Sequence, residues 1–193
     1  MPKRDSLKIR TFICLELPEE IRNYIYKEMV QPLKTSNIRC SWVSPENIHL
    51  TLKFLGDIST EKIELIEKVI FDSTENIEDF EVQLSKMGTF GGRRIRVVWT
   101  GIDGDVDRIG DLAKNLDKAL SKIGFKREKR KFSAHITLGR IRDQEGIERL
   151  LEILRGIEVK SDSFTINRVI LMKSELTPRG SIYSPLGVFH LNN

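Results

Sequence analysis

The chain has 193 residues, of which 39% are hydrophobic and 31% charged, a composition that supports a packed core and excludes a disordered chain. No apolar run approaches the roughly 20 residues that a membrane-spanning helix requires, and the first residues lack the apolar stretch of a signal peptide. The formal net charge of +4 permits an anionic partner without requiring one. We therefore expect a soluble, cytoplasmic protein that has no membrane partner.

The cysteines and histidines do not indicate a metal site. Cys14 and Cys40 stand apart in apolar surroundings, and the chain contains three histidines. Isolated cysteines in such surroundings are more often buried free thiols than disulfide partners or metal ligands. We therefore predict two free thiols and no zinc framework.

The first half of the chain alternates between strand and helix patterns. Runs rich in β-branched and aromatic residues predict strands over residues 7–17, 38–43, 48–55 and 80–87. Pro18 and the two glutamates after it start a helix whose apolar residues continue at helical spacing to about Leu33. Gly56 is expected to end the third strand, and Ser59 or Thr60 to cap a second amphipathic helix.

The second half of the chain repeats this order. Strands are predicted over residues 94–101, 132–140, 164–173 and 182–190. A helix is predicted over about residues 105–122 with Gly124 as its stop, and a second helix ends at Gly156. Residues 177–180 have a Thr-Pro-Arg-Gly sequence that is typical of a hairpin turn.

Each half therefore has roughly a βαββαβ order, which predicts a pseudo-two-fold molecule. We predict an α+β fold with two pseudo-symmetric lobes, whose antiparallel sheets face a central groove and whose helices lie outside. The lobes form a single domain over residues 1–193. Lobe 1 is expected to cover about residues 1–90 and lobe 2 about residues 91–193, with a C-terminal hairpin over residues 164–190.

A four-residue pattern, His-aliphatic-Thr-Leu, occurs once in each half. The first tetrad is residues 49–52 (HLTL) and the second tetrad is residues 135–138 (HITL). Because successive side chains of a strand point to opposite faces, the aliphatic residues are expected in the core and the His-Thr pairs on the other face. Lys53 is expected to share the face of His49, and Phe54 to face the core. The pseudo-two-fold predicts that the two His-Thr pairs meet across the groove.

Two facing imidazoles suit acid–base chemistry at phosphorus. Histidine has an ordinary pKa that allows both protonation states near neutral pH, so His49 and His135 could move protons to and from the oxygens of a phosphodiester. The hydroxyls of Thr51 and Thr137 could donate to the non-bridging phosphate oxygens. A single His-x-Thr strand is usually structural, but two copies in equivalent places favour a functional site. The sequence lacks the Asp/Glu cluster of a two-metal nuclease.

Several other residues allow two interpretations each. The basic clusters at residues 126–131 and 93–96 could bind a phosphate backbone or form solvated faces. Lys53 could bind phosphate or be an ordinary exposed charge, and Phe12 could stack a nucleobase or pack in the core. Trp99, like Trp42, is expected to be structural.

The tetrads and their surroundings resemble the two-histidine phosphoesterase superfamily, whose mark is a pair of His-x-Thr-x motifs. The closer resemblance is to its RNA 2′,3′-cyclic phosphodiesterase branch, whose members are also known as 2′-5′ RNA ligases. An opening strand, two tetrad regions (HLTLKFLG and FSAHITLGR) and a C-terminal hairpin carry the resemblance, over residues 10–18, 42–56, 132–140 and 171–186. The family often has proline before the second histidine, where this chain has Ala134.

This resemblance implies hydrolysis of RNA 2′,3′-cyclic phosphate ends to 2′-phosphomonoesters without a metal or other cofactor. It also implies a weak, reversible and ATP-independent joining of RNA ends through a 2′-5′ linkage. By position, His49 matches the general acid of the family and His135 its general base. Thr51 and Thr137 match the hydroxyls with which the family binds phosphate.

Arg140 matches an arginine that the family places against phosphate just after the second motif. Strand parity gives Arg140 the core face, the face of Leu138. Arg140 therefore reaches the groove only if the strand kinks or bulges near Gly139.

Two alternatives to an enzyme of this kind stay open. A binding module could hold a terminal phosphate with the same His-Thr pairs without turning it over, and a metalloprotein could use His49, His135 and His190. A matched acid and base favour the enzyme, because a binder does not need them. The expected partner is RNA with a 2′,3′-cyclic phosphate end, tRNA fragments being one candidate, and we expect a monomer.

Overall fold

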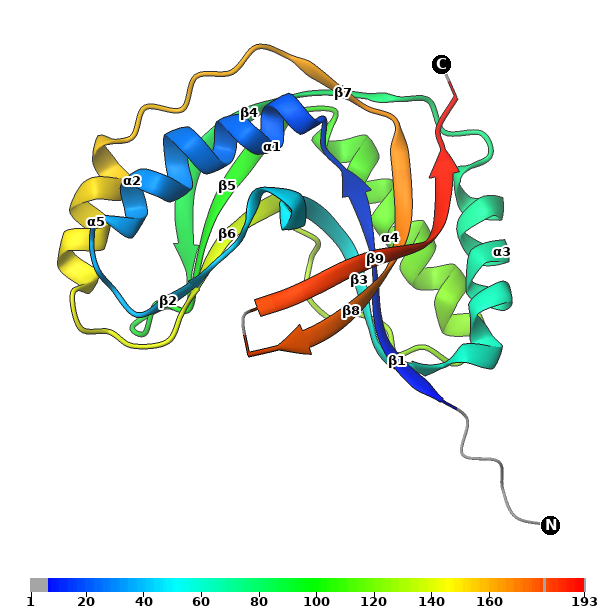
Figure 1. Ribbon diagram of the computed structural model, residues 1–193. Coiled ribbons are helices and arrows are strands. Elements are labelled where there is room, and N and C mark those ends of the chain that lie inside the picture. Colours follow the sequence, from blue (N-terminus) through cyan, green and yellow to red (C-terminus); the bar gives the residue numbers. More distant parts are fainter. Residues whose placement is uncertain (1–6, 179, 193) are drawn as a thin grey trace.

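The structure is a computed structural model that describes residues 7–178 and 180–192. Its centre is one curled antiparallel sheet with helices on the outside (Figure 1). The strands are β1 (Lys8–Glu16), β2 (Cys40–Trp42), β3 (His49–Ser59), β4 (Phe80–Phe90), β5 (Val97–Gly104), β6 (His135–Ile141), β7 (Phe164–Ile166), β8 (Arg168–Thr177) and β9 (Gly180–His190). This architecture confirms the predicted α+β fold with helices outside.

Five α-helices and three short helical turns surround the sheet in the described part of the chain. The helices are α1 (Glu19–Ile25), α2 (Gln31–Lys34), α3 (Ile63–Thr74), α4 (Val106–Lys122) and α5 (Ile147–Gly156). The turns are η1 (Tyr26–Val30), a π-helical segment that joins α1 to α2, and the 3₁₀ turns η2 (Pro45–Asn47) and η3 (Thr60–Lys62). None of the helices of the described residues is long and apolar enough to cross a membrane.

The sheet consists of two halves that meet at the tetrads. The strand order is β7-β4-β5-β6-β3-β1-β8-β9, and β2 pairs with β6. The halves join where β3 pairs with β6, at Leu50 and Ile136. Each half contains strands from both of the expected lobes, because β8 pairs with β1 in one half and β4 pairs with β5 in the other. The expected end of lobe 1, at about residue 90, therefore falls at the end of β4, which is paired with β5 in the same half of the sheet.

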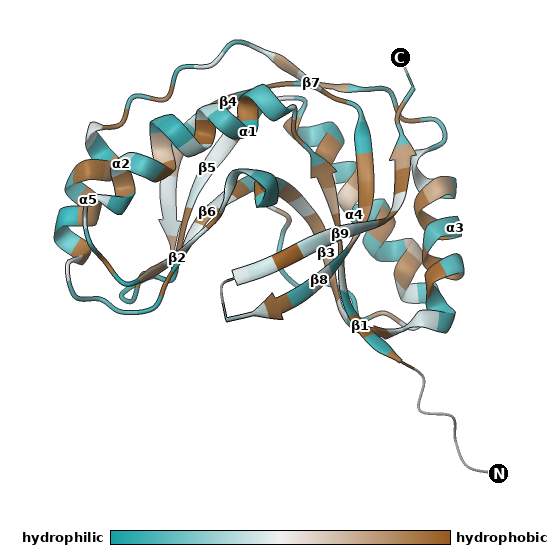
Figure 2. Cartoon of the chain, viewed as in Figure 1, coloured by the Kyte–Doolittle hydropathy of each residue, from teal (hydrophilic) through white to brown (hydrophobic). Residues whose placement is uncertain are grey.

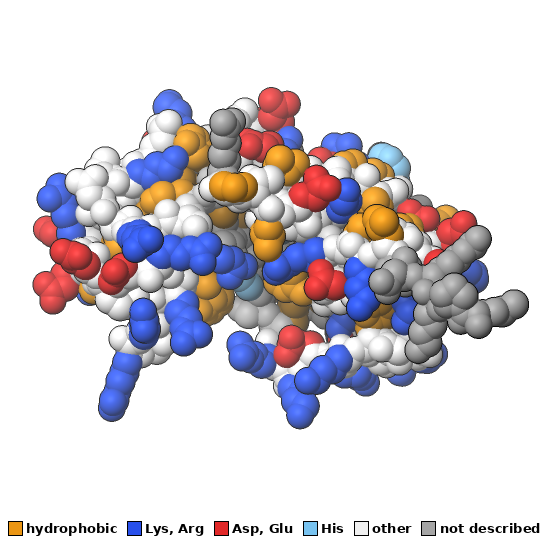
Figure 3. Space-filling model, turned by 60° about the horizontal axis from the view of Figure 1, so that its bottom comes forward, with side chains coloured by type: hydrophobic (Ala, Val, Ile, Leu, Met, Phe, Trp, Pro, Cys, Tyr) orange, Lys and Arg blue, Asp and Glu red, His pale blue; other side chains and the backbone are white. Residues whose placement is uncertain are grey.

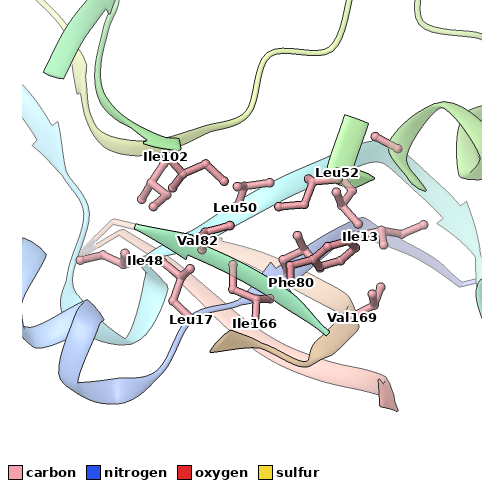
Figure 4. Close-up of a cluster of buried hydrophobic side chains, with 14 of the residues drawn as sticks. Ile13, Leu17, Ile48, Leu50, Leu52, Phe80, Val82, Ile102, Ile166 and Val169 are labelled. Carbon is pink, nitrogen blue, oxygen red and sulfur yellow. The ribbon is translucent and has the colours of Figure 1, made fainter. Parts of the chain in front are cut away.

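The core lies between the sheet and the helices and runs through both halves. Figure 4 shows part of it, a cluster to which strands of both halves contribute: Ile13, Leu17, Ile48, Leu50, Leu52, Phe80, Val82, Ile102, Ile166 and Val169. The helices carry hydrophobic and hydrophilic bands in Figure 2, and the predicted apolar face of α4 is buried from Ile109 to Leu120. Burial of each such aliphatic side chain contributes roughly 1.5–3 kcal/mol.

Two of the differences between predicted and observed strands have a clear local cause. β3 does not end at Gly56 but continues to Ser59, because Gly56 takes a φ of 75° and stays paired with Thr11 of β1. The predicted strand over residues 164–173 is divided at Asn167. Its first part pairs with β4 and its second part with β1, so the chain crosses from one half of the sheet to the other.

Both cysteines are free in the structure, as predicted. Cys14 is buried and Cys40 is partly buried. Burial raises the pKa of both thiols, that of Cys40 to about 12. Neither thiol is therefore a ready nucleophile near neutral pH.

Candidate active site

The two tetrads lie side by side at the centre of the sheet. β3 begins at His49 and β6 begins at His135, and the two strands pair antiparallel at Leu50 and Ile136. If this register is continued by one residue in each direction, His49 lies opposite Thr137 and Thr51 lies opposite His135. Cross-strand neighbours have Cβ atoms about 4.5–5.5 Å apart. The four polar side chains therefore form one cluster on a single face of the sheet.

The face that carries this cluster is hollowed and basic. Leu50 and Ile136 are fully buried on the opposite face, so the His-Thr pairs point away from the core as predicted. Figure 3 shows a histidine side chain in the hollow at the middle of this face, with lysine and arginine side chains around it. We call this hollowed face the groove.

Both imidazoles are oriented by the same backbone hydrogen bond. Nδ1 of His49 lies 2.7 Å from the carbonyl oxygen of Asn47, and Nδ1 of His135 lies 2.7 Å from that of Ser133. A carbonyl oxygen only accepts hydrogen bonds, so each Nδ1 carries a proton and donates it. Each ring therefore presents Nε2 as its reactive atom, and Nε2 of His49 lies 3.0 Å from Oγ1 of Thr51.

Aromatic side chains pack against each imidazole. Phe12 stacks on His49 at 4.8 Å between ring centroids, and Tyr183 meets the same ring edge-on at 5.5 Å. Phe90 meets His135 edge-on at 4.9 Å. Phe12 is only 3% exposed, so its ring has no free face for a nucleobase. The prediction that Phe12 could stack a base is therefore wrong, and packing behind the site was the correct alternative.

Burial lowers the pKa of His49 to about 4. The nearby positive charges of Arg140 and His135 lower this pKa further, and the hydrogen bond to the carbonyl oxygen of Asn47 opposes the shift. His49 is therefore neutral at pH 7 when the groove holds no anion.

This pKa shift predicts that acid weakens the fold. The unfolded chain takes up a proton at His49 near pH 6.5, whereas the folded chain does so only near pH 4. The free energy of unfolding should therefore fall as the pH drops from 6.5 to 4, by up to about 3 kcal/mol from this group. Urea unfolding at several pH values, with His49→Asn as the comparison, measures this effect. An equal pH dependence of the two proteins would contradict the shift.

A β-bulge turns Arg140 toward the groove. Thr137 pairs with Trp99 and Gly139 pairs with Val98, so Leu138 is an extra residue on β6. The side-chain alternation is inverted after this residue, and Arg140 returns to the face of Thr137. Arg140 is exposed there. The bulge near Gly139 that strand parity required for Arg140 to reach the groove is therefore present.

An equivalent bulge on β3 reverses the faces of the sheet on which Lys53 and Phe54 lie. Cys14 pairs with Thr51 and Ile13 pairs with Lys53, so Leu52 is the extra residue. The prediction that Lys53 shares the face of His49 is wrong, because Lys53 points to the opposite face and is 9% exposed. Its Nζ lies 2.6 Å from Oδ1 of Asp117 and 3.0 Å from the carbonyl oxygen of Lys126.

Phe54, which was predicted in the core, lies on the groove face instead. Its Cα partner is Phe12, whose ring contacts His49, and the two phenylalanine rings are 6.0 Å apart. The side chain is 59% exposed. Phe54 therefore offers the free aromatic face that Phe12 does not.

The bulge on β6 requires glycine at position 139. A Cβ atom there would lie 2.6 Å from Sγ of Cys40 and 2.6 Å from Cε3 of Trp42. We therefore expect Gly139→Ala to lower the free energy of unfolding by about 1–3 kcal/mol, the usual range for overpacking. Thermal unfolding measures the change, with Gly156→Ala as the control because its Cβ would meet nothing within 4 Å. Equal effects of the two substitutions would contradict this packing.

Comparison with known proteins identifies the family. The model of the family described as LigT like phosphoesterase matches residues 15–99 and again residues 102–183, so each match contains one tetrad. An RNA 2′,3′-cyclic phosphodiesterase of Methanothermobacter thermautotrophicus is 35% identical over 187 residues, which cover 96% of this chain and all of that protein. The chain belongs to the LigT-like phosphoesterase family.

Other relatives support the same assignment. An RNA 2′,3′-cyclic phosphodiesterase of Methanocaldococcus jannaschii is 33% identical and covers 91% of the chain and 96% of that protein. The crystal structure of E. coli LigT complexed with 3′-AMP has a TM-score of 0.76 at 25% identity, with 97% of this chain and all of that chain covered. TT0787 of Thermus thermophilus shares the fold, with a TM-score of 0.79 at 22% identity over 95% of this chain and 98% of that chain.

Several cations of this LigT-like chain lack ion-pair partners among the described residues. Arg127 pairs with Asp117, but the other basic side chains of segment 126–131 form no ion pair within the described residues, and neither does Arg140. Such cations are available to an anionic ligand. In the same described ranges, no three His, Cys, Asp or Glu side chains lie close enough together to hold a metal ion.

Proposed function

We propose that this chain hydrolyses the 2′,3′-cyclic phosphate at the end of an RNA to a 2′-phosphomonoester. The observation that carries the proposal is the pair of His-Thr strands that lie side by side, in which a backbone carbonyl holds Nδ1 of each imidazole and leaves Nε2 as the reactive atom. The relatives that share this chain's family and most of its length are named RNA 2′,3′-cyclic phosphodiesterases. Arg140, which lies on the groove face and forms no ion pair among the described residues, suits an anionic RNA end rather than an uncharged ligand.

In the proposed reaction His135 acts as the base and His49 as the acid. Nε2 of His135 takes a proton from water, and the water oxygen attacks phosphorus in line with the bond to O3′. That bond breaks, and Nε2 of His49 gives its proton to O3′, so that the phosphate remains on O2′. The hydroxyls of Thr51 and Thr137 donate to the non-bridging oxygens, where negative charge increases in the transition state. Every group in this scheme belongs to the chain or to the substrate, so no metal or cofactor is required.

The proposed acid must gain its proton when the substrate binds. His49 is neutral at pH 7 in the free groove, because burial and the nearby charge of Arg140 lower its pKa. A bound phosphodiester anion offsets the charge of Arg140 and stabilises the imidazolium, so substrate binding raises the pKa of His49. Arg140 therefore has two effects. It attracts the phosphate of the substrate, and in the free groove its charge disfavours the protonation of His49.

The terminal nucleobase has a suitable surface on the His49 side of the groove. The leaving oxygen belongs to the terminal ribose, so the terminal nucleoside lies on the side of the acid. Phe54 is on that side and 59% exposed. An aromatic face accepts any of the four bases by stacking. We propose that Phe54 stacks the base of the cyclic nucleotide.

The same site could join RNA ends at a low rate. If a ribose 5′-hydroxyl replaces water, a bond from phosphorus to O5′ forms as the bond to O3′ breaks, and the product is a 2′-5′ phosphodiester. One phosphodiester bond replaces another, so the reaction needs no ATP and is reversible. We propose this as a secondary activity. The tetrads of one chain complete the site, which supports a monomer as the active form, and tRNA fragments in the cytoplasm are candidate substrates.

The experiment that tests the proposed function is an analysis of reaction products. A short RNA that ends in a 2′,3′-cyclic phosphate is incubated with the protein, and the position of the phosphate is determined by nuclease digestion and chromatography. The proposal predicts a 2′-phosphate, because the bond to O3′ is the one that breaks. A 3′-phosphate as the main product would contradict the proposed geometry.

A further inference from the structure

The groove carries an aromatic pair that the proposed hydrolysis does not use. Phe90, the last residue of β4, stacks on Trp99 with ring centroids 5.0 Å apart and 25° between the planes. The same ring meets His135 edge-on at 4.9 Å. Phe90 is 37% exposed. A flat apolar surface therefore lies directly beside the proposed base.

The strand register places this pair on the face of the second tetrad. Trp99 is the Cα partner of Thr137 on β6 and of Gly88 on β4, and Phe90 lies two residues beyond Gly88. The indole ring of Trp99 lies directly over Gly88, where a Cβ atom would collide with its six-membered ring. Both rings therefore belong to the wall of the groove on the His135 side.

Packing alone does not favour this position of Trp99. Its Nε1 is buried and has no hydrogen-bond partner among the described residues. A buried indole N–H usually has an acceptor, because leaving the donor unpaired is costly. Trp99 was predicted to be structural, and its ring stacks on Phe90 while its own N–H stays unpaired.

The turn between β4 and β5 adds positive charge next to the stack. Residues 91–96 include Arg93, Arg94 and Arg96, and none of the three forms an ion pair in the part of the chain that the structure describes. The turn is held in place, because the backbone of Ile95 exchanges two hydrogen bonds with the side chain of Gln144. Aromatic faces combined with free arginines are typical of surfaces that bind single-stranded nucleic acid.

The in-line geometry of the reaction determines which nucleoside this surface would meet. The entering oxygen approaches on the side of the base, His135, and O3′ of the terminal ribose departs on the opposite side, toward His49, while O2′ keeps its bond to phosphorus. A water molecule needs no aromatic surface beside it. A nucleoside that enters through its 5′-hydroxyl brings a base, and that base would lie next to Phe90.

We propose that the Phe90–Trp99 stack and the turn 91–96 form a subsite for the 5′-hydroxyl nucleotide of a second RNA strand. This inference rests on the proposed function, because it uses the same histidines. The 5′-oxygen attacks phosphorus and its proton goes to Nε2 of His135, while the bond to O3′ breaks and Nε2 of His49 protonates O3′. The incoming base continues the Trp99–Phe90 stack, and the arginines bind the next phosphate of that strand.

A competition between transfer and hydrolysis tests the subsite. A labelled RNA with a 2′,3′-cyclic phosphate end is mixed with a 5′-hydroxyl trinucleotide, or with the same trinucleotide lacking its first base. The ratio of 2′-5′ joined product to hydrolysed product is then measured. The wild-type ratio should be about tenfold higher with the intact acceptor, the order of effect expected for one stacked base. Phe90→Leu should remove this preference. Phe71→Leu should keep it, because that ring is 54% exposed on α3, outside the groove.

A second variant tests the arginine turn. Arg94→Gln should weaken the use of the trinucleotide and reduce the salt dependence of the transfer reaction, because one phosphate contact is lost.

Three results would overturn the subsite while leaving the proposed function intact. They are hydrolysis by the wild type without any preference for the base-bearing acceptor, an unchanged preference in Phe90→Leu, and an equal loss of hydrolysis and transfer in that variant. The last result would mean that Phe90 only supports His135. If the wild type opens no cyclic phosphate at all, the proposed function itself fails.

Discussion

Replacing His49 or His135 with alanine is expected to lower kcat/KM for a 2′,3′-cyclic phosphate RNA by about 10²- to 10⁴-fold in each case. Each variant removes one of the two Nε2 atoms that face the ligand, and with it either the transfer of a proton from water or the transfer of a proton to O3′. Each imidazole lies at the first residue of its strand and is partly exposed, so the loss of the ring should leave the sheet intact. Steady-state kinetics and circular dichroism on each variant measure both effects.

The third histidine provides the matched control for this prediction. His190 is exposed at the end of β9 and pairs with Arg168 of β8, outside the tetrads. His190→Ala should retain the wild-type rate within about a factor of two, the scatter expected of a surface substitution. If His190→Ala is as slow as the tetrad variants, or if either tetrad variant keeps wild-type activity, the two-histidine scheme is wrong.

The largest expected effect on stability comes from the buried carboxylate behind the site. Asp117 accepts hydrogen bonds from Lys53 at 2.6 Å, from Nε of Arg127 at 3.0 Å and from the backbone N–H of Glu128 at 3.0 Å. These contacts hold the pKa of Asp117 below its ordinary value against the opposing effect of burial. Asp117→Ala leaves the ammonium of Lys53 buried and unpaired. We therefore expect the free energy of unfolding to fall by about 3–5 kcal/mol, as measured by urea unfolding.

An exposed ion pair on α3 provides the comparison. Lys68 and Asp72 are 3.2 Å apart, but their side chains are 71% and 55% exposed, so Asp72→Ala should change the stability by only about 0.3–0.5 kcal/mol. The double variant Lys53→Met/Asp117→Leu should recover most of what Asp117→Ala loses, because it leaves no unpaired charge in the core. Similar losses from Asp117→Ala and Asp72→Ala would show that the buried network has no special importance.

The sequence predicted the tetrads and their common face because two periodic signals agree there. The aliphatic residues of each tetrad alternate with His and Thr, and Leu50 and Ile136 are indeed fully buried. The order of strands and helices was also predictable from periodicity and turn residues. The pairing of β8 with β1 was not predictable, because no local signal specifies which distant strand a chain segment joins.

The residues beyond each tetrad could not be assigned from alternation alone. A one-residue bulge at Leu52 reverses the faces of Lys53 and Phe54, and the bulge at Leu138 does the same for Gly139 and Arg140. Gly139, directly after the second tetrad, was a local signal of the bulge, whereas the first tetrad is followed directly by Lys53. Arg140 was recognised through the family resemblance, whereas the exposure of Phe54 was missed.

The two bulges also show where the pseudo-symmetry of the groove is broken. Phe54 and Arg140 occupy equivalent positions, each two residues after the last residue of its tetrad, and both lie on the groove face. One side therefore offers an aromatic surface and the other a cation. This asymmetry suits the proposed site, in which Phe54 stacks the terminal base and Arg140, whose charge also acts on His49, binds the phosphate.

The most direct test of the account is a turnover assay in the presence of EDTA. Wild-type protein is mixed with a short RNA that ends in a 2′,3′-cyclic phosphate, and both binding and ring opening are followed. The account predicts multiple turnovers in the chelator, because the proton transfers use only the imidazoles of His49 and His135. RNA that binds while its ring stays intact would contradict the account and favour a phosphate-binding module, and turnover that EDTA abolishes would favour a metalloenzyme.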